Sequence, residues 1–225
     1  MKRKIIQTSD GSSTIYIEEL DEHYHSKHGA IQEAYHVFIK SGFYPFLKEN
    51  SSTELSILEI GFGTGLNSFI TFIEAEKTGV RVTYDGVEAY PVSLEEVKHL
   101  NYVAELKAIN KADVFDKMHQ ITWGDYHELS ESFQLKKRKI FFNEISDKNI
   151  FDIIYFDAFG ARVQPELWEV SIFKKMYDAL KSNGMLVTYA AKGSVRRAMQ
   201  EVGFEVERLP GPPGKREMLR AVKRG

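Results

Sequence analysis

Strand and helix signals alternate regularly from residue 55 onward, and this alternation constrains the fold more than any other feature of the chain. Ile150–Phe156 is a nearly unbroken apolar run, which is typical of a strand buried on both faces of a sheet. Strands separated by helices form parallel sheets, because a parallel pair needs a long crossover connection. We therefore predict an α/β domain with a seven-stranded, mostly parallel sheet that ends in an antiparallel hairpin. The predicted strands are Leu55–Ile60, Arg81–Val87, Gln120–Trp123, Ile150–Phe156, Met185–Tyr189, Phe204–Arg208 and Glu217–Val222.

Helical segments fill the intervals between these strands. Pro165 suits the first turn of a helix that runs to about Lys181, and Asn183-Gly184 would end it. Other helices are predicted over Gly65–Lys77 and Ser194–Val202.

The first fifty residues differ in character from the rest of the chain. Thr14–Leu20 alternates like a short strand, and Gly29–Lys40 reads as a helix. We expect residues 1–50 to form an N-terminal extension or lid packed on the core, and residues 51–225 to form the main domain.

Composition excludes several classes of protein. Cysteine is absent, so disulfides, thiolate metal sites and a cysteine nucleophile are excluded. No apolar run approaches the roughly 18–20 residues that span a bilayer, and no signal-peptide pattern follows the basic start of the chain. We expect a cytoplasmic protein with no membrane partner and a monomer as the default state. The net charge of −2 argues against a globally basic protein, although 30 Lys and Arg residues can still form a local basic face.

A glycine-rich turn joins the first strand of the main domain to its first helix. The segment Glu59-Ile-Gly-Phe-Gly-Thr-Gly-Leu-Asn67 has the spacing G-x-G-x-G, whereas a dinucleotide fingerprint would read G-x-G-x-x-G. Glycines suit a tight turn that a ligand approaches closely. The alternative is a plain tight turn with no ligand.

Acidic residues stand at the ends of successive strands. Glu59 would repel a pyrophosphate, whereas S-adenosylmethionine carries an ammonium and a sulfonium. Glu88 is placed to accept hydrogen bonds from two ribose hydroxyls, and Asp125 could accept from an adenine amino group. The alternative is that these acids cap helices. The predicted S-adenosylmethionine-binding residues are Glu59, Gly61, Phe62, Gly63, Gly65, Asn67, Glu88, Ala89, Asp125 and Asp157.

Three separated blocks give the chain a closer resemblance. Over residues 55–225 the chain resembles Rossmann-like class I methyltransferases. It is similar more narrowly to the methyltransferase half of the MnmC proteins, which also occurs as the stand-alone MnmD. The blocks are Tyr24-His-Ser with His28-Gly-Ala and Glu33-Ala-Tyr-His-Val-Phe38, then Asp157-Ala-Phe-Gly160 with Pro165-Glu-Leu-Trp168, and Gly211-Pro-Pro-Gly-Lys-Arg-Glu-Met-Leu-Arg220.

The resemblance implies conversion of 5-aminomethyl(-2-thio)uridine at the tRNA wobble position to 5-methylaminomethyl(-2-thio)uridine. Fused relatives carry an oxidase domain that uncovers the amine, and we expect this chain to depend on another source of it. Relatives often have a proline soon after the Asp-x-Phe sequence, where this chain reads Gly160-Ala-Arg162. That departure leaves the shape of the loop open.

Asp157 and Phe159 are the predicted catalytic residues. Asp157 would orient the acceptor amine and accept its proton, directly or through water. Phe159 would form an apolar wall and stack on the pyrimidine. The segment is similar to the Asp-Pro-Pro-Tyr loop of amino-group nucleic-acid methyltransferases. The alternatives are a helix-capping acid and an ordinary core aromatic residue.

Contacts with the tRNA anticodon stem-loop require basic side chains and a base flipped into the pocket. The run Lys136–Lys139 is a candidate for contacts with tRNA phosphates, and the alternative is that it is a solvated surface segment. Histidines 23, 25 and 28 could bind a metal, contact the cofactor or substrate from a lid, or be surface residues; we predict no metal site. The predicted substrate- and tRNA-binding residues are His28, Glu33, Tyr35, Lys192, Arg196, Arg197, Lys215 and Arg216.

Rival functions remain open from the sequence. An aminopropyl transferase would use a decarboxylated form of the same cofactor on the same fold. A methyltransferase acting on a small amine would have no RNA partner, and a non-catalytic cofactor-binding subunit would not need Asp157 and Phe159. A nicotinamide-linked oxidoreductase is disfavoured by the glycine spacing and by the closing hairpin.

Overall fold

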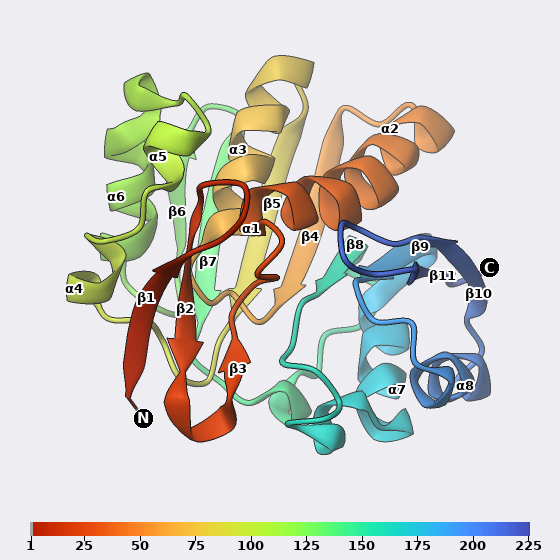
Figure 1. The fold of residues 1–225 in the computed structure, drawn as a ribbon. Helices are drawn as coiled ribbons and strands as arrows, with labels where there is room; N and C mark the ends of the chain where they lie inside the picture. Colours follow the sequence, from red (N-terminus) through yellow and green to blue (C-terminus); the bar gives the residue numbers. More distant parts are fainter. Residues whose placement is uncertain (1) are drawn as a thin grey trace.

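A computed structural model describes residues 2–225 and is built around one large mixed sheet (Figure 1). Its strands are β4 (Glu54–Ile60), β5 (Arg81–Val87), β6 (Tyr126–Ser130), β7 (Phe133–Arg138), β8 (Phe151–Phe156), β9 (Leu180–Thr188), β10 (Glu205–Pro210) and β11 (Glu217–Val222). Their order is β10-β11-β9-β8-β4-β5-β7-β6. The five strands from β9 to β7 are parallel, and β11 and β6 pair antiparallel with their neighbours. The predicted Rossmann-like α/β class, mostly parallel with a closing hairpin, is confirmed.

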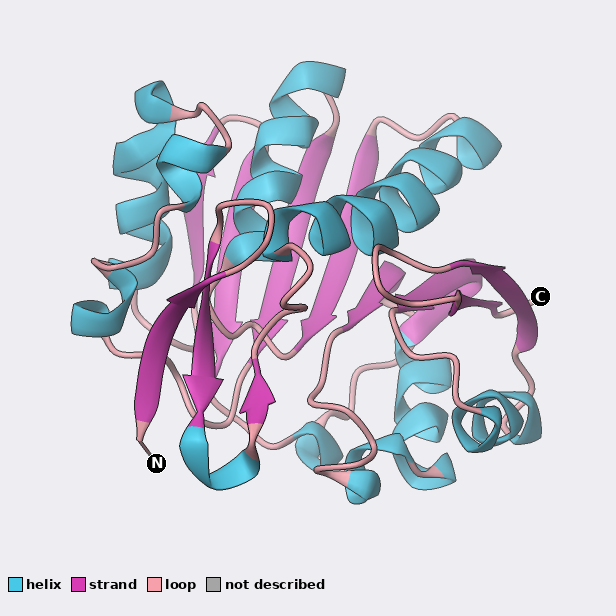
Figure 2. Ribbon diagram, viewed as in Figure 1, coloured by secondary structure: helices cyan, strands magenta, loops and turns pink. Residues whose placement is uncertain are grey.

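Helices cover both faces of this sheet (Figure 2). One apolar core joins the sheet to α3 and to the long N-terminal helical run, and a second joins its other face to α7 and α8. The helical elements of the main domain are α3 (Leu66–Thr78), α4 (Leu94–Val97), α5 (Tyr102–Glu105), η3 (Ile109–Lys111), α6 (Ala112–Gln120), η4 (Phe142–Glu144), η5 (Pro165–Trp168), α7 (Val170–Ala179) and α8 (Gly193–Glu201).

The sheet has eight strands where the sequence predicted seven, because one edge was misread. Trp123, in the predicted strand Gln120–Trp123, forms only an isolated bridge with Lys137. The strand that pairs with β5 on the side away from β4 is β7, which is reached through the β6–β7 hairpin. Lys137 is buried in this strand, where its ammonium donates to the His119 carbonyl at 2.7 Å and lies over the Trp123 ring. The basic residues 136–138 are therefore part of strand β7 and not of a solvated surface segment.

The helix predicted from Pro165 to about Lys181 is divided and ends earlier. A 3-10 turn, η5, precedes α7, and α7 ends at Ala179. The carbonyls of Asp178 and Ala179 accept from the backbone amides of residues 149 and 150, so the chain leaves the helix there. Asn183, with φ of 62°, lies inside β9, where the pairing with β8 shifts register, and does not end a helix.

The N-terminal residues form a small sheet followed by a long helical run. The sheet contains β1 (Arg3–Gln7), β2 (Ser13–Ile17) and β3 (Glu22–His23), with the turn η1 (Glu18–Leu20) between the last two. The helical run is α1 (Ala30–Ala34), the π-helical η2 (Tyr35–Phe43) and α2 (Tyr44–Asn50), and it packs on β8, β9 and α3. The strand predicted over Thr14–Leu20 therefore stops at Ile17, and the helix predicted over Gly29–Lys40 extends to Asn50.

The start of α1 is capped by residues from the first hairpin. Asp10 accepts from the backbone amide of Gln32 at 3.0 Å. Thr8 and Ser12 accept from the two amides that precede it in the chain, at 3.4 Å each. These bonds satisfy first-turn amides that a helix leaves without partners. The hairpin itself is tied to the main domain by two bonds between Ser13 and Asn101. None of the helices within residues 2–225 has the length and apolar character to cross a bilayer.

Candidate active site

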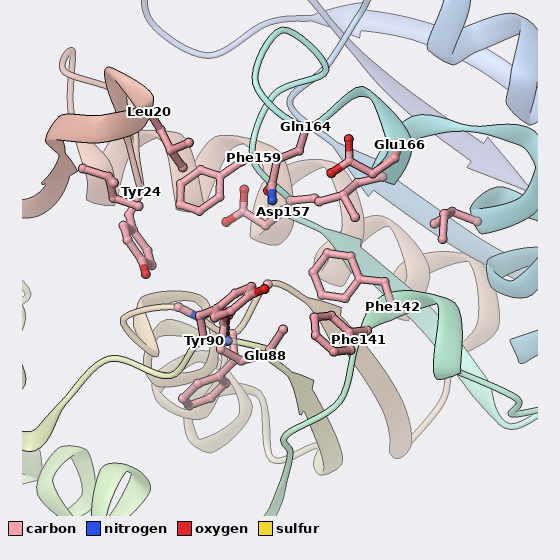
Figure 3. Close-up of a pocket in the computed structure, with 18 of the residues that line it drawn as sticks. Leu20, Tyr24, Glu88, Tyr90, Phe141, Phe142, Asp157, Phe159, Gln164 and Glu166 are labelled. Atoms are coloured by element: carbon pink, nitrogen blue, oxygen red, sulfur yellow. Dashed lines mark hydrogen bonds between the residues drawn. The ribbon is translucent and has the colours of Figure 1, made fainter. Parts of the chain in front are cut away.

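The loops that follow β4, β5 and β8 meet at one edge of the sheet and line a cavity of about 420 Å³. The chain order of the strands reverses at β4, because β5 lies on one side of it and β8 on the other. Such a reversal opens a crevice at the carboxyl ends of the strands, which is where open α/β sheets bind ligands. In Figure 3, Asp157 and Phe159 lie on one wall and Glu88 and Tyr90 on the facing wall.

The glycine-rich turn forms the floor of the cavity. The backbone amides of Gly61 and Phe62 both donate to the Val87 carbonyl at 3.0 Å, which holds the turn against β5. Gly61 has φ of +90°, and a Cβ there would lie 2.5 Å from the Asp157 carbonyl oxygen. Only glycine satisfies both the backbone conformation and this close approach. The turn therefore packs directly against the backbone of the loop that follows β8.

Glu88 presents its carboxylate at the opposite wall. One oxygen accepts from the Gly63 amide at 3.1 Å and the other from the Tyr90 amide at 2.9 Å. A carboxylate has about four lone-pair positions, so both oxygens keep capacity for a ligand's hydroxyl groups.

Asn67 connects two acids across the floor. Its amide nitrogen donates to Glu59 at 2.9 Å and to Asp157 at 2.8 Å. Glu59 is fully buried behind the cavity, and burial raises the pKa of its carboxyl well above the usual value. Among the described residues, the second Glu59 oxygen and the Asn67 Oδ1 have no hydrogen-bond partner. Asn67 lines the cavity, so its free oxygen is an acceptor available to a cationic or amide ligand.

Asp157 is the acid whose proton affinity suits chemistry near neutral pH. Burial raises the pKa of its carboxyl to about 7, and the negative charge of Glu33 adds to the rise. The Asn67 hydrogen bond and the positive charge of Lys215 oppose it. A carboxylate with a pKa near the working pH can take a proton and release it again.

The loop after β8 is fixed from two sides. The Trp168 indole donates to the Phe159 carbonyl at 2.7 Å, and the Tyr189 hydroxyl donates to the Ala158 carbonyl at 2.8 Å. The Phe159 ring meets Tyr24 of the N-terminal segment edge-on, with 5.1 Å between centroids. Phe159 and Tyr24 thus form an aromatic wall beside Asp157 (Figure 3).

Most of the predicted cofactor residues, but not all, lie at the cavity. Glu59 lies behind the floor, Gly65 packs against His119, and Asp125 is exposed outside the cavity. Asp125 lies elsewhere because the β6–β7 hairpin intervenes, so the loop beyond the end of β7 reaches the cavity in its place. The predicted cofactor and catalytic residues that line the cavity are Gly61, Phe62, Gly63, Asn67, Glu88, Ala89, Asp157 and Phe159.

Sequence reasoning missed an aromatic cluster at this wall. Phe141, Phe142 and Asn143 follow β7 and line the cavity together with Tyr90. Phe141 and Tyr90 are about half exposed, and their rings meet edge-on with 6.0 Å between centroids. The signal was the pair Phe141-Phe142 directly after the basic run, which becomes meaningful only once that run is recognised as a strand. Other missed lining residues are Arg3, Leu20, Tyr24, Gln164 and Glu166.

The predicted substrate-binding residues are dispersed. The hydroxyl of Tyr35 donates to Glu74 at 2.9 Å, so it faces α3 and not the cavity. Glu33 pairs with Lys215 at 2.5 Å, and neither lines the cavity. His28 is exposed and packs against Gly214. Lys192, Arg197 and Arg216 are exposed, whereas Arg196 is half-buried.

The three histidines have separate environments. His23 packs on Tyr16, and His25 contacts the hydroxyls of Thr14 and Thr64 at 3.1 and 3.4 Å. No group of three or more potential metal ligands was found among residues 2–225. His25 lines the cavity and links the N-terminal segment to the glycine-rich turn.

Replacement of His25 should reduce the loss of folding stability that occurs as the pH is lowered. Burial lowers the pKa of His25 to about 4. Between pH 6.5 and 4 the unfolded chain binds this proton and the folded chain does not, so the free energy of unfolding falls as the pH falls, by up to about 3 kcal/mol. We expect His25→Gln to lose less stability than the wild type between pH 7.5 and pH 4.5, as measured by urea unfolding. Equal losses in the two proteins would contradict this assignment.

Comparisons with known proteins agree with the geometry of the site. The profile of a family described as S-adenosyl-L-methionine-dependent methyltransferase matches residues 115–224. The chain is 32% identical over 218 residues to the tRNA 5-methylaminomethyl-2-thiouridine biosynthesis bifunctional protein MnmC of Leptospira interrogans, and 26% identical over 213 residues to that of Idiomarina loihiensis. These alignments cover 90% and 88% of this chain but 32% and 35% of the relatives. The chain therefore spans about a third of the length of the curated relatives it matches.

Solved structures show the same fold. The crystal structure of MnmC2 from Aquifex aeolicus superposes with a TM-score of 0.74 at 23% identity, and covers 98% of this chain and 70% of its own. Spermidine synthase from Thermotoga maritima superposes with a TM-score of 0.51 at 14% identity, and covers 98% of this chain and 71% of its own. The chain is therefore similar to the S-adenosyl-L-methionine-dependent methyltransferase family over residues 115–224, and to part of the MnmC proteins over most of its length.

Proposed function

We propose that this chain methylates the amino group of 5-aminomethyl(-2-thio)uridine at the tRNA wobble position, and so forms 5-methylaminomethyl(-2-thio)uridine. The observation that carries the proposal is Asp157, an acid with a pKa of about 7 beside an aromatic wall at a methyltransferase cavity. The printed name of the Leptospira relative supports the choice of tRNA and of this nucleoside.

The residues at the cavity fit S-adenosylmethionine. The cofactor supplies a methyl group on a sulfonium, already activated for transfer. The glycine-rich turn lines the cavity at Gly61 and Gly63, and Glu88 keeps lone pairs for ribose hydroxyls. The unpartnered oxygen of Asn67 would accept from the ammonium. Aromatic side chains at Tyr90, Phe141 and Phe142 offer apolar surface for the adenine.

Asp157 would act on the acceptor amine. A primary amine is largely protonated at neutral pH, so its lone pair must be freed before it can attack. The amine nitrogen would gain the methyl group as the bond between that methyl and the sulfonium sulfur breaks, with the bonding electrons left on sulfur. The nitrogen loses one proton, which Asp157 accepts directly or through water. Phe159 would hold the pyrimidine and exclude water. Alignment of the nucleophile with the methyl group supplies much of the rest of the rate.

The N-terminal residues would complete the site as a lid. Ile17, Leu20, Tyr24 and His25 line the cavity, which supports the division into a lid of residues 1–50 and a methyltransferase domain of residues 51–225. The proposal includes a cytoplasmic enzyme that acts as a monomer on the anticodon stem-loop.

Nucleoside mass spectrometry tests the proposal. The purified protein and S-adenosylmethionine would be incubated with tRNA from cells that lack this methylation. We expect loss of the 5-aminomethyl nucleoside and gain of the 5-methylaminomethyl nucleoside. If calorimetry shows that the cofactor binds but no conversion occurs, the proposed substrate is wrong, and free polyamines with the decarboxylated cofactor would be tested next.

Replacement of exposed basic residues should reduce the salt dependence of the reaction. Arg197 and Arg216 are exposed. Each phosphate contact that is lost should flatten the slope of log kcat/KM against log salt by about 0.7–0.9. We expect Arg197→Ala and Arg216→Ala to show this change. Arg81→Ala, at the opposite end of β5, is the control and should keep the wild-type slope. Unchanged slopes in all three variants would remove these arginines from the interface.

A further inference from the structure

Lys215 is held by other residues instead of extending into solvent. Its ammonium pairs with Glu33 at 2.5 Å and lies 3.8 Å from the centroid of the Tyr189 ring. Glu33 is buried, and its other oxygen accepts from the Ser26 amide at 2.8 Å. A lysine with a buried carboxylate and a ring face as neighbours is poorly placed to reach a phosphate.

The Glu33–Lys215 pair is close to Asp157 without lining the cavity. The Lys215 ammonium lies over the Tyr189 ring, and the Tyr189 hydroxyl donates to the carbonyl of Ala158, the residue after Asp157. The charges of Glu33 and Lys215 both act on Asp157, in opposite directions. The pair therefore lies near Asp157, but neither of its side chains lines the cavity where a ligand would bind.

The pair also fixes two distant segments in place. Glu33 belongs to α1, and Lys215 to the turn between β10 and β11. A second bond joins the neighbouring elements, between the His36 ring of η2 and the carbonyl of Pro210, the last residue of β10, at 2.8 Å. Gly214 has φ of +83° and touches His28 so closely that a Cβ would collide with it. The turn is thus held against the N-terminal helical run and His28.

We propose that Glu33 and Lys215 are a positioning pair for Asp157, which together fix how readily its carboxylate takes up a proton. The proposal deepens the proposed function, because it rests on Asp157 receiving the proton of the acceptor amine. It replaces the expectation that Lys215 binds a tRNA phosphate.

The sign of each contribution follows from charge. The positive charge of Lys215 favours the ionised carboxylate, and the negative charge of Glu33 disfavours it. Removal of Lys215 should therefore make Asp157 titrate at higher pH, and neutralisation of Glu33 should make it titrate at lower pH. The other polar and titratable groups that act on Asp157 directly or through Glu59 are Asn67 of α3, Glu59 of β4, Tyr84 of β5, Glu88 after β5 and Tyr189 after β9.

Carbon-13 NMR of the aspartate carboxyl groups tests the proposal with neither tRNA nor cofactor, so a failed proposed function would not affect it. Protein labelled at the aspartate side-chain carboxyl would be titrated, and Asp157→Asn would identify the signal. We expect Lys215→Met to move the Asp157 midpoint up, and Glu33→Gln to move it down, each by about one pH unit. Lys215→Arg keeps the charge and should restore a midpoint near the wild-type value.

Two results would overturn the proposal. One is a midpoint that stays within experimental error in both Lys215→Met and Glu33→Gln, with Lys215→Met still folded by circular dichroism. The other is an upward shift in Lys215→Met that Lys215→Arg does not reverse, which would indicate lost packing instead of lost charge. If the midpoint is unmoved and Lys215→Met also flattens the salt dependence of tRNA binding, Lys215 is a phosphate contact.

Discussion

Asp157→Asn should lower the rate of methyl transfer by about 10²–10⁴-fold, the range expected when a proton acceptor is removed. The amide keeps the shape of the side chain and can still accept from Asn67, so cofactor affinity should stay within a few-fold of the wild type. In the wild type the rate should rise with pH through about 7 and then level off, because Asp157 must be ionised to take a proton. Single-turnover rates and calorimetry measure the two effects separately.

Asp152→Asn is the matched control, because Asp152 lies at the other end of the same strand and pairs with Lys181. It should leave the rate unchanged. A rate near the wild-type value in Asp157→Asn would show that the amine loses its proton elsewhere.

Asp157→Asn should also stabilise the fold at neutral to alkaline pH. The pKa of Asp157 is higher in the folded chain than in the unfolded one, so between pH 3.8 and about 7 the folded state binds more protons. The free energy of unfolding therefore falls as pH rises through this window, and the destabilisation is complete above about pH 7. Asp157→Asn removes it, with a gain of at most about 4 kcal/mol at pH 8. Urea unfolding at pH 4 and pH 8 measures the difference.

Gly61→Ala should abolish useful cofactor binding. The added Cβ would lie 2.5 Å from the Asp157 carbonyl oxygen, and a backbone atom cannot move aside as a flexible side chain can. Relief of the clash would shift the turn away from the Asp157 backbone, and the floor of the cavity would move with it. We expect a loss of about 2–4 kcal/mol in the free energy of unfolding. Cofactor affinity should fall at least about 100-fold, because a ligand held in a fixed geometry tolerates little displacement.

Gly79→Ala separates the clash from the cost of backbone conformation. Gly79 ends α3 with φ of +71°, and a Cβ there would meet nothing within 4 Å. It should cost about 1 kcal/mol from positive φ alone and leave cofactor affinity unchanged. Equal effects from the two substitutions would show that the close approach to Asp157 has no role.

Local patterns in the sequence were sufficient to predict the central strands. β4, β5 and β8 lie within one residue of their predicted bounds, because each is rich in apolar or β-branched and aromatic residues. The three loops that follow them could therefore be assigned to one edge of a parallel sheet, and with them Gly61, Glu88 and Asp157 to one wall or another of a cavity.

The remaining features depend on contacts between distant residues. β7 carries Lys136, Lys137 and Arg138, and its burial depends on partners that the local sequence does not indicate. Lys137 tolerates burial because the His119 carbonyl and the Trp123 ring receive its ammonium. With this strand missed, Asp125 was assigned to the cavity instead of the Phe141–Asn143 loop. The pairing of Glu33 with Lys215 is equally invisible to a local pattern.

The distance between Glu33 and Lys215 along the chain, 182 residues, gives the two halves of the site different times of formation during synthesis. The strands and turn that face the cofactor come from residues 54–90, which leave the ribosome long before β11. The contacts around Lys215 close the longest loops in the fold, so they form late. A nascent chain halted before residue 210 would hold a partial cofactor pocket beside an unfinished acceptor wall. During synthesis the chain would then become able to bind the methyl donor before the surroundings of Asp157 are complete.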